Sequence, residues 1–368
     1  MTAGPLFQQT VLFRQGEGGV HTYRIPALAE TRKGTLIAVA DARHDGTGDL
    51  PARISLVIRR SFDQGRTWTP TRTLYAVKAG GVGDASLLVD RTNGRVWCFH
   101  AYGGPGVGFG TATATALEVH AMHSDDDGET WSEPEDVSPQ FRDPSWKGMF
   151  ATSGTNHQLT SGRLLVPLVT RDAQGVVGSR NVYSDDHGKT WRAGSAGGSD
   201  TDESHAVELA GGVVMQNMRN GKTRAIAISH DGGVTFGAMS HDAVLVDPSC
   251  NAGITRFGDA VLFTNAASAT KRERLTIRMS RDGARTWPVS RVIHEGPAAY
   301  STVIALSDGT IGVLYEAGER SSIERIEFAR FDAEWLTANP AAFEFRTPAV
   351  RTGDRTMDTS YRIAIGDL

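Results

Sequence analysis

One octapeptide pattern recurs five times along the chain and constrains its fold more than any other feature. The pattern is Ser-x-Asp-x-Gly-x-Thr-Trp. Its copies are SFDQGRTW at 61–68, SDDDGETW at 124–131, SDDHGKTW at 184–191, SHDGGVTF at 229–236 and SRDGARTW at 280–287. The fourth copy ends in phenylalanine, and the fifth has Ala284 in place of the glycine. Internal repeats at such intervals indicate a repeat architecture such as a propeller.

Each copy has the composition of a tight turn between two strands. Serine and aspartate side chains bond backbone groups of a turn, and glycine supplies a positive φ. In the first copy we expect Asp63 to tie the loop, Gly65 to allow the reversal and Trp68 to pack between neighbouring sheets. The aspartates of the pattern are therefore interpreted as structural. They are Asp63, Asp126, Asp186, Asp231 and Asp282.

The segments around the repeats predict an all-β fold. Apolar runs such as ISLVIRR at 54–60, GRLLVPLV at 162–169 and GVVMQNM at 212–218 indicate strands, and helical periodicity is scarce. The repeats begin roughly 45 to 63 residues apart, a spacing that suits one four-stranded blade each. Five repeats, with unassigned segments at both ends, predict a six-bladed β-propeller whose last blade is closed by both termini. We expect a single domain over residues 1–368.

Charge and cysteine content exclude several classes of function. The net charge is −4, from 38 basic and 42 acidic residues, so the chain lacks the positive field typical of a nucleic-acid binder. An anionic ligand must therefore meet a local cluster of arginines. Cys98 and Cys250 are too few and too far apart for a disulfide framework or a zinc site, and we expect two buried free thiols.

Membrane, metal and phosphate sites are not expected. No segment has the roughly 20 apolar residues that span a bilayer, and residues 1–15 do not have the pattern of a signal peptide. We expect a cytoplasmic protein, or an extracellular one if a leader has been removed. His120 and His123 would point to opposite faces of a strand, so we expect no metal and no cofactor. The glycine-rich stretch at 103–110 lacks the context of a phosphate loop and is expected to be a mobile loop near a pocket mouth.

The repeats resemble the Asp-box of the sialidase superfamily, and the tetrapeptide Tyr-Arg-Ile-Pro at 23–26 is similar to a second signature of that family. Matching motifs follow in the expected order from Tyr23 to Glu316. The resemblance implies the six-bladed sialidase propeller and a retaining exo-α-sialidase, a glycoside hydrolase. Its substrates would be sialylated oligosaccharides, glycoproteins and glycolipids. By the same resemblance, Arg24 is the first of three arginines that bind the sugar carboxylate.

Further acidic and basic residues in the first quarter of the chain match family motifs. The resemblance places Arg43 near the glycerol or O4 side of the sugar and makes Asp49, six residues later, the general acid. Asp45 is the rival to Asp49 for that role. Asp84 is the candidate for binding the N-acetyl amide at C5. Asp41 stands where family members often have glutamate and is a weaker assignment.

The second half of the chain supplies the remaining candidates. DESHAVELAGGVVMQNMRN at 202–220 resembles the family's glutamate followed by a strand ending in Asn-x-Arg, and this matches Glu203 and Arg219. In the run ahead of the fifth repeat, Arg272 fits the third arginine, with Arg274 as the alternative. Tyr300 matches the family's nucleophile, and Glu316 would hold the first arginine of the clamp.

The residue types suit the chemistry of sialic acid, which carries a carboxylate on its anomeric carbon. Arginines bind a carboxylate bidentately and orient it. A neutral phenol avoids the charge repulsion that a carboxylate nucleophile would meet there, and tyrosine nucleophiles are known among sialidases. Because a phenol has a pKa near 10, Tyr300 needs a base, and Glu203 would accept its proton.

Two alternatives remain beside the exo-α-sialidase. The first is a trans-sialidase, or a hydrolase of a related 2-keto acid sugar such as deaminated sialic acid or a Kdo-type sugar, which would use the same arginines. The second is a non-catalytic, carbohydrate-binding propeller that keeps the Asp-boxes alone. Retention of Arg24, Asp49, Glu203 and Tyr300 together argues against the second.

Overall fold

The computed structural model describes residues 4–110 and 116–338. The chain divides into two units, Met1–Thr337 and Ala338–Leu368. The first unit contains every strand described below. The prediction of a single domain reaching residue 368 extends beyond the described residues and stays a prediction.

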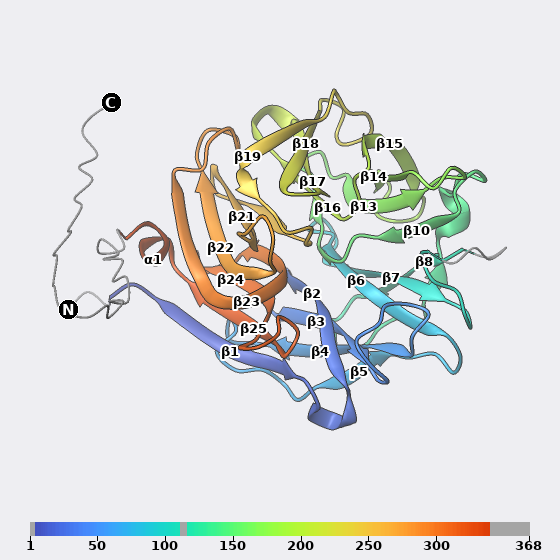
Figure 1. The fold of residues 1–368 in the computed structure, drawn as a ribbon, viewed down its shortest axis with the longest axis horizontal. Coiled ribbons are helices and arrows are strands. Elements are labelled where there is room, and N and C mark those ends of the chain that lie inside the picture. The colour runs from blue at the N-terminus through green and yellow to red at the C-terminus, as the bar shows by residue number, and fades with distance from the viewer. Residues whose placement is uncertain (1–3, 111–115, 339–368) are drawn as a thin grey trace, which may run out of the picture. The chain divides into compact units, whose positions relative to one another are not determined.

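The first unit is an all-β propeller of five hydrogen-bonded sheets, four small and one of seven strands (Figure 1). The first sheet contains β2 (Thr22–Glu30), β3 (Leu36–Arg43), β4 (Ile54–Ser61) and β5 (Arg72–Tyr75). The second contains β11 (Gly154–Thr155), β6 (Gly81–Val89), β7 (Val96–Gly103), β8 (Glu118–Ser124) and β9 (Glu135–Asp136). The third contains β10 (Gly148–Ala151), β13 (Leu164–Arg171), β14 (Val177–Ser184) and β15 (Arg192–Ser199), with β12 (His157–Gln158) paired to β13. The fourth contains β16 (Ser204–Glu208), β17 (Val214–Asn220), β18 (Thr223–Ser229) and β19 (Ser240–Val246).

The seven-stranded sheet differs from the expectation of six separate blades. It contains, in spatial order, β1 (Phe7–Arg14), β25 (Arg325–Phe331), β24 (Ile311–Ala317), β23 (Val289–Ala305), β22 (Glu273–Ser280), β21 (Ala260–Ala266) and β20 (Gly253–Phe257). Strand β23 is 17 residues long. Its first part pairs with β22 and its second part with β24. Because successive parts of β23 pair with β22 and with β24, two four-stranded units merge into one sheet, and four small sheets remain.

The two ends of the described chain meet in this sheet. Strand β1 pairs antiparallel with β25, from Phe7 opposite Phe331 to Arg14 opposite Arg325. Figure 1 shows β1 beside β25 at the edge of the sheet. The helices in the described residues are short: α1 (Ala333–Thr337) and 3₁₀ turns at Glu17–Gly19, Ser138–Gln140 and Ala210–Gly212. Among the described residues, no helix has the length and apolar character needed to cross a membrane.

The repeats form the predicted hairpin turns with one common set of hydrogen bonds. In the first copy, Ser61 Oγ donates to Asp63 Oδ1 at 2.8 Å and accepts from the Gly65 backbone N at 2.8 Å. Asp63 Oδ1 also accepts from the Thr67 backbone N at 2.9 Å. The other four copies repeat the bonds to serine and aspartate. Ala284 adopts a φ of 64°, so the fifth turn keeps the left-handed conformation without glycine.

The turns also connect neighbouring sheets, because the glycine of each of the first four turns faces the sheet before it. A Cβ added to Gly128 would meet Ile37 of β3, and one added to Gly188 would meet Trp97 of β7. A Cβ on Gly65 would meet Phe328 of β25, so the first repeat packs on the last sheet. This succession of contacts returns to its starting point, as a propeller requires.

Apolar side chains fill the spaces between consecutive sheets. Between the first two sheets the core includes Ile37, Val39, Leu56, Ile58, Val82, Leu87, Val96, Cys98 and Met122. Cys98 and Cys250 are both buried and free. The prediction of two buried free thiols is confirmed.

We expect Gly65→Ala to destabilise the fold by about 2–4 kcal/mol, because it combines a left-handed backbone with overpacking. Gly65 has a φ of 83°, and its added Cβ would lie under 3.0 Å from the Phe328 ring. Gly175→Ala is the matched control, with a φ of 86° and no atom of the described chain within 4 Å. It should cost only about 1 kcal/mol. Urea unfolding would measure both, and equal losses would contradict the packing argument.

Candidate active site

Strands of three different sheets bring the predicted site residues together. Arg24 lies in β2, Glu203 immediately precedes β16 and Tyr300 lies within β23. Strand β2 is irregular at this point, with a register shift between Arg24 and Ala27 and a φ of 60° at Ile25. A β-branched residue in the left-handed region is a strained outlier. The local distortion re-aims the Arg24 side chain relative to a regular strand.

Tyr300 is the residue on which the site converges. Its hydroxyl donates to Glu203 Oε2 at 2.6 Å and accepts from Arg219 Nη1 at 3.1 Å. Arg219 Nη1 also lies 2.7 Å from Glu203 Oε2. Phenol, carboxylate and guanidinium therefore form a closed triangle of polar contacts, with the Tyr300 ring packed against the buried Cys250.

Asp202 is a site residue that the sequence analysis missed. Both of its carboxylate oxygens accept from Arg219, from Nε at 2.5 Å and from Nη2 at 2.6 Å. Asp202 and Glu203 thus hold the same guanidinium from two directions. The available signal was the pair of adjacent acids just ahead of a predicted strand, of which only the second was assigned.

Glu316 anchors Arg24 from beneath. Arg24 donates to it twice, from Nε at 3.0 Å and from Nη2 at 3.1 Å. The backbone N of Ile25 donates at 2.9 Å and that of Tyr300 at 3.2 Å. Burial lowers the pKa of the Arg24 guanidinium, but the Glu316 carboxylate outweighs it and raises that pKa above its ordinary value. Arg24 therefore stays charged although it is largely buried.

Arg272, and not Arg274, faces this site. The Arg272 guanidinium carbon lies 5.4 Å from the centre of the Tyr300 ring, and that of Arg24 lies 5.2 Å from it. Arg272 also donates to the Ser249 backbone O at 2.9 Å. The Arg274 side chain is 55% exposed and its Nε lies 3.8 Å from a Glu295 oxygen. All three arginines predicted as the clamp thus contact Tyr300.

Burial and charge together set the protonation of Tyr300 and Glu203. Burial raises the pKa of the Tyr300 phenol well above its ordinary value, the Glu203 charge raises it further, and Arg219 opposes both. Burial also raises the pKa of the Glu203 carboxyl, with Arg219 and the Tyr300 hydroxyl opposing. The resting phenol is therefore protonated and needs a base for any nucleophilic step. Glu203 is within reach of that proton.

Arg43 holds the segment that carries Asp49. The Arg43 side chain is only 2% exposed, and its Nη2 lies 2.6 Å from Asp49 Oδ1. Its Nη1 donates to the Thr47 backbone O at 2.6 Å. Asp49 itself is 80% exposed. The expected role of Arg43 at the glycerol or O4 side stays a prediction, while its contacts show that it positions the Asp49 loop.

Asp45, the rival to Asp49, forms an ion pair with Arg53 on the protein surface. Arg53 donates to both of its oxygens, at 3.0 Å from Nε and 2.6 Å from Nη2. Burial lowers the pKa of Arg24, and the charge of Asp49, by contrast with that of Asp45, is among those that raise it, after Glu316 and Tyr300. The Asp49 carboxylate therefore lies within electrostatic reach of the clamp.

Asp84, which is half-buried, forms an acidic pair with the buried Asp41. The Asp84 backbone N donates to Asp41 Oδ1 at 3.0 Å, and Asp84 has a φ of 57°. Gly83 makes room for the pair, because an added Cβ there would lie 3.0 Å from Asp41 Oδ2. Burial raises the pKa of Asp41 to about 7, with Arg43 opposing. Burial, and next the charge of Asp41, raise the pKa of Asp84 well above its ordinary value.

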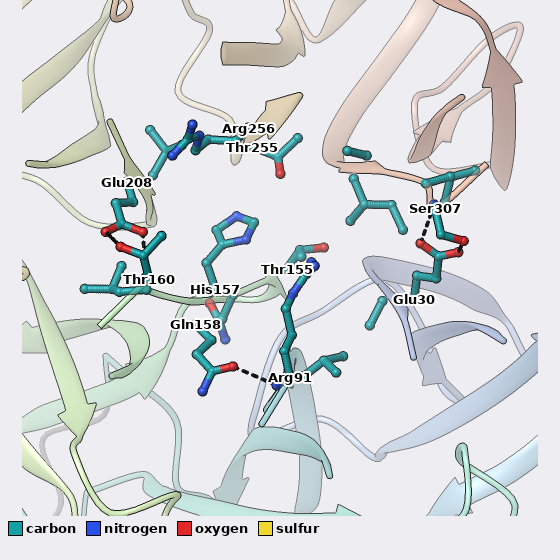
Figure 2. A pocket seen from close by; sticks show the side chains of 18 of the residues that line it. Glu30, Arg91, Thr155, His157, Gln158, Thr160, Glu208, Thr255, Arg256 and Ser307 are labelled. Atoms are coloured by element: carbon teal, nitrogen blue, oxygen red, sulfur yellow. Dashed lines mark hydrogen bonds between the residues drawn. The ribbon is translucent and has the colours of Figure 1, made fainter. Parts of the chain in front are cut away.

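A cavity of about 590 Å³ lies away from this cluster. Figure 2 shows Glu30, Glu208 and Arg256 among the residues that line it. Glu30 ends β2 and Glu208 ends β16, whereas the site residues lie toward the beginnings of these strands. Glu30 is bonded to Ser307 and Glu208 to Thr160. The cavity and the candidate site therefore lie toward opposite ends of the same strands.

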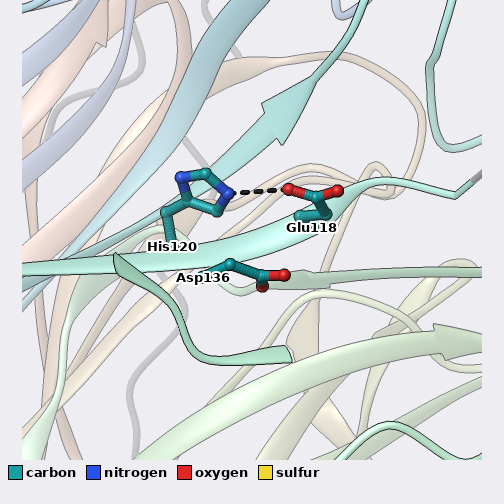
Figure 3. Close-up of side chains that lie close together, drawn as sticks. All are labelled: Glu118, His120 and Asp136. Atoms are coloured by element: carbon teal, nitrogen blue, oxygen red, sulfur yellow. Dashed lines mark hydrogen bonds and ion pairs between the residues drawn. The ribbon is translucent and has the colours of Figure 1, made fainter. Parts of the chain in front are cut away.

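Among the residues that the structure describes, one group of side chains has the composition of a metal-ligand set. Glu118, His120 and Asp136 offer ligand atoms within 4.8 Å of one another, on β8 and β9 (Figure 3). His120 Nε2 lies 2.8 Å from Glu118 Oε2, and Asp136 accepts from the Ser138 backbone N. His123, the other histidine considered in the sequence, lies 3.8 Å from Asp125 instead. None of these residues touches Tyr300 or the three arginines in the described structure.

Comparisons with known proteins agree with these motifs. Residues 34–313 match the BNR repeat-like domain family. The chain is 40% identical to a sialidase of Micromonospora viridifaciens over 378 residues, covering 95% of this chain and 58% of that protein. It therefore spans less than two thirds of that relative's length.

Solved structures give the same result for the fold. The structure titled Hadza microbial sialidase superposes with a TM-score of 0.83 at 31% identity, covering 89% of this chain and 69% of the other. The intramolecular trans-sialidase of Ruminococcus gnavus superposes with a TM-score of 0.78 at 20% identity, covering 90% of this chain and 99% of the other. The second likeness concerns the fold alone.

The raised pKa of the Asp41 carboxyl makes the stability of the fold depend on pH. The folded state holds this proton up to about pH 7, whereas an unfolded carboxyl releases it near pH 4. The folded state therefore binds more protons in this range, and stability falls as the pH rises through it. Asp41→Asn removes this titration. The free energy of unfolding of the variant minus that of wild type should therefore increase by on the order of 2–4 kcal/mol from pH 4.5 to pH 7.5.

Urea unfolding at both pH values would measure this gain. Asp45→Asn is the control, because hydrogen bonds from Arg53 lower the pKa of exposed Asp45, and that variant should not gain as the pH rises. A stability difference for Asp41→Asn that is the same at both pH values would contradict the buried, protonated state.

Proposed function

The chain belongs to the sialidase superfamily, and from this premise we propose that it is a retaining exo-α-sialidase that removes terminal N-acetylneuraminic acid from glycoconjugates. One observation carries the proposal: the Tyr300 hydroxyl donates to a buried glutamate, Glu203, while three arginines surround the phenol. A tyrosine that serves only for packing would not need this concentration of charge.

The three arginines are proposed to bind the sugar carboxylate. Arg24 and Arg219 each already have a carboxylate behind them, Glu316 and Asp202, so their outer guanidinium edges are fixed in orientation. Arg272 is held through the Ser249 carbonyl. A clamp that is oriented before the ligand arrives loses less entropy on binding.

Tyr300 is proposed to be the nucleophile and Glu203 its base. The phenol oxygen attacks the anomeric carbon as its proton passes to Glu203 over the existing 2.6 Å hydrogen bond. Asp49 donates a proton to the departing glycosidic oxygen. In the second step Asp49 takes a proton from water, the resulting nucleophile attacks the anomeric carbon, and the tyrosyl bond breaks as Glu203 returns the proton. Two displacements give overall retention.

Asp84 is proposed to face the N-acetyl amide at C5. The raised pKa of both carboxyls in the Asp41–Asp84 pair, caused first by burial, leaves that pair protonated more readily than ordinary carboxyls. Such a pair offers both donors and acceptors to an amide.

We further infer that the seven-stranded sheet counts as two blades sharing β23, which makes six blades in one catalytic domain.

Transfer to a sugar acceptor is the second candidate activity. It would use the same nucleophile and clamp, and a protein titled an intramolecular trans-sialidase shares the fold. Product analysis with and without excess lactose would separate the two, because a hydrolase releases free sialic acid in both cases. A panel of 2-keto acid glycosides that differ at C5 would test the related sugars.

Tyr300→Phe should reduce hydrolysis of sialyl-lactose by on the order of 10³-fold or more, because the nucleophile is removed with little change in volume. The arginine clamp should remain, so a carboxylated sialic acid analogue should bind within a few-fold of its wild-type Kd. Tyr183→Phe, in β14, is the control and should keep its activity. Near-wild-type turnover of Tyr300→Phe would refute the tyrosine mechanism.

Asp49→Ala should lose far more activity on sialyl-lactose than on a 4-methylumbelliferyl sialoside. A sugar alkoxide is a strong base and needs a proton donor, whereas an aryl oxide leaves with little help, so the gap should be roughly 10²–10⁴-fold. Asp45→Ala is the matched control, with a carboxylate four residues away that binds Arg53. Equal losses of Asp49→Ala on both substrates would assign Asp49 a binding or structural role.

A further inference from the structure

The loop that carries Asp49 is held from two sides. It joins β3 to β4, and its stem closes through the His44 backbone N, which donates to the Arg53 backbone O at 3.1 Å. On one side Arg43 binds Asp49 itself. On the other side Leu50 enters an apolar cluster with Ala101, Val107, Leu117, Phe109 and Phe150. The residue after Asp49 is therefore half-buried against this cluster, while Asp49 is exposed.

Two glycines form the surface on which Leu50 rests. An added Cβ at Gly108 would lie under 3.0 Å from the Leu50 carbonyl oxygen and 3.0 Å from Pro51 Cδ. One at Gly81 would lie 2.6 Å from Leu50 Cδ2 and under 3.0 Å from the Ala52 carbonyl oxygen. The atoms in the way are mostly backbone, which cannot swing aside like the end of a flexible side chain. Side chains at these two positions would have to displace the Asp49 loop.

The glycines are not explained by backbone conformation. Neither Gly81 nor Gly108 is among the glycines with positive φ, so an alanine could adopt either backbone conformation without strain. Gly80 and Gly106, by contrast, do have positive φ. What positions 81 and 108 provide is close approach of one segment to another.

We propose that Gly81 and Gly108 are positioning residues for the general acid, a role that rests on the proposed function of Asp49. Their missing side chains let Leu50 and Pro51 sit close to the second sheet and so fix how far Asp49 reaches toward the glycosidic oxygen. Restoring an ordinary contact would move the Leu50 peptide by about 1 Å, and a misplacement of that size can cost ~10²-fold in rate. The cost falls on proton donation, because the clamp and the nucleophile lie on other strands.

Gly108→Ala should therefore lose about 10–100-fold in kcat on sialyl-lactose and less than about 3-fold on a 4-methylumbelliferyl sialoside. Gly104→Ala is the matched control in the same loop, with no positive φ and no atom of the described residues within 4 Å. It should keep both activities. Gly81→Ala provides an independent test from the opposite contact, should Gly108→Ala fail to fold.

Crystal structures of the variants separate this inference from the proposed function. The Asp49 Cα should move by about 1 Å in Gly108→Ala and stay in place in Gly104→Ala. An unmoved Asp49, or equal losses on the two substrates, would overturn the positioning role whatever the activity of the unsubstituted protein. If the unsubstituted protein hydrolyses neither sialoside, the proposed function fails, and the displacement of Asp49 alone still decides whether the glycines set its position.

Discussion

The buried carboxylate of Glu316 is the constraint on which the site depends. It accepts four hydrogen bonds, two from Arg24 and one each from the backbone of Ile25 and Tyr300. A buried charge is tolerated only when it is paired and fully hydrogen-bonded. Meeting that requirement fixes one arginine of the clamp, the strained turn of β2 and the backbone of the proposed nucleophile with a single side chain. Asp202 likewise fixes the orientation of Arg219 by accepting two hydrogen bonds from its guanidinium.

Local turn chemistry was fully visible in the sequence, because the Asp-box depends on contacts within eight residues. Serine and aspartate bond the turn in all five copies, and the sequence pattern predicts that directly. The strand runs were equally local, although β13 and β17 each begin two residues later than the apolar runs suggested. The merging of two four-stranded units through β23 could not be predicted, because the strands with which β23 pairs are set by tertiary contacts.

Among the candidate site residues, motif order indicated Arg24, Glu203 and Tyr300 and also Glu316 as the partner of Arg24, but not Asp202, which holds Arg219. Asp202 was missed because a sequence does not show in which direction each of two adjacent acidic side chains points. In the structure both carboxylates contact Arg219. The choice of Arg272 over Arg274 depends on the structure, in which the Arg272 guanidinium lies over the Tyr300 ring and the Arg274 side chain is exposed. The contact of Gly108 with Leu50 joins segments 58 residues apart and leaves no pattern in either.

The pairing of β1 with β25 has a consequence for how the chain is made. Residues 7–14 are synthesised before their partner strand, at 325–331, which emerges from the ribosome only after more than 300 further residues. Until then β1 is an unpaired strand, and such edges invite pairing with other chains. The ring can therefore close only after β25 has been made, and the long separation of its two closing strands makes this a slow, non-local step. A cell producing this protein must keep β1 from pairing with other chains while more than 300 further residues are made.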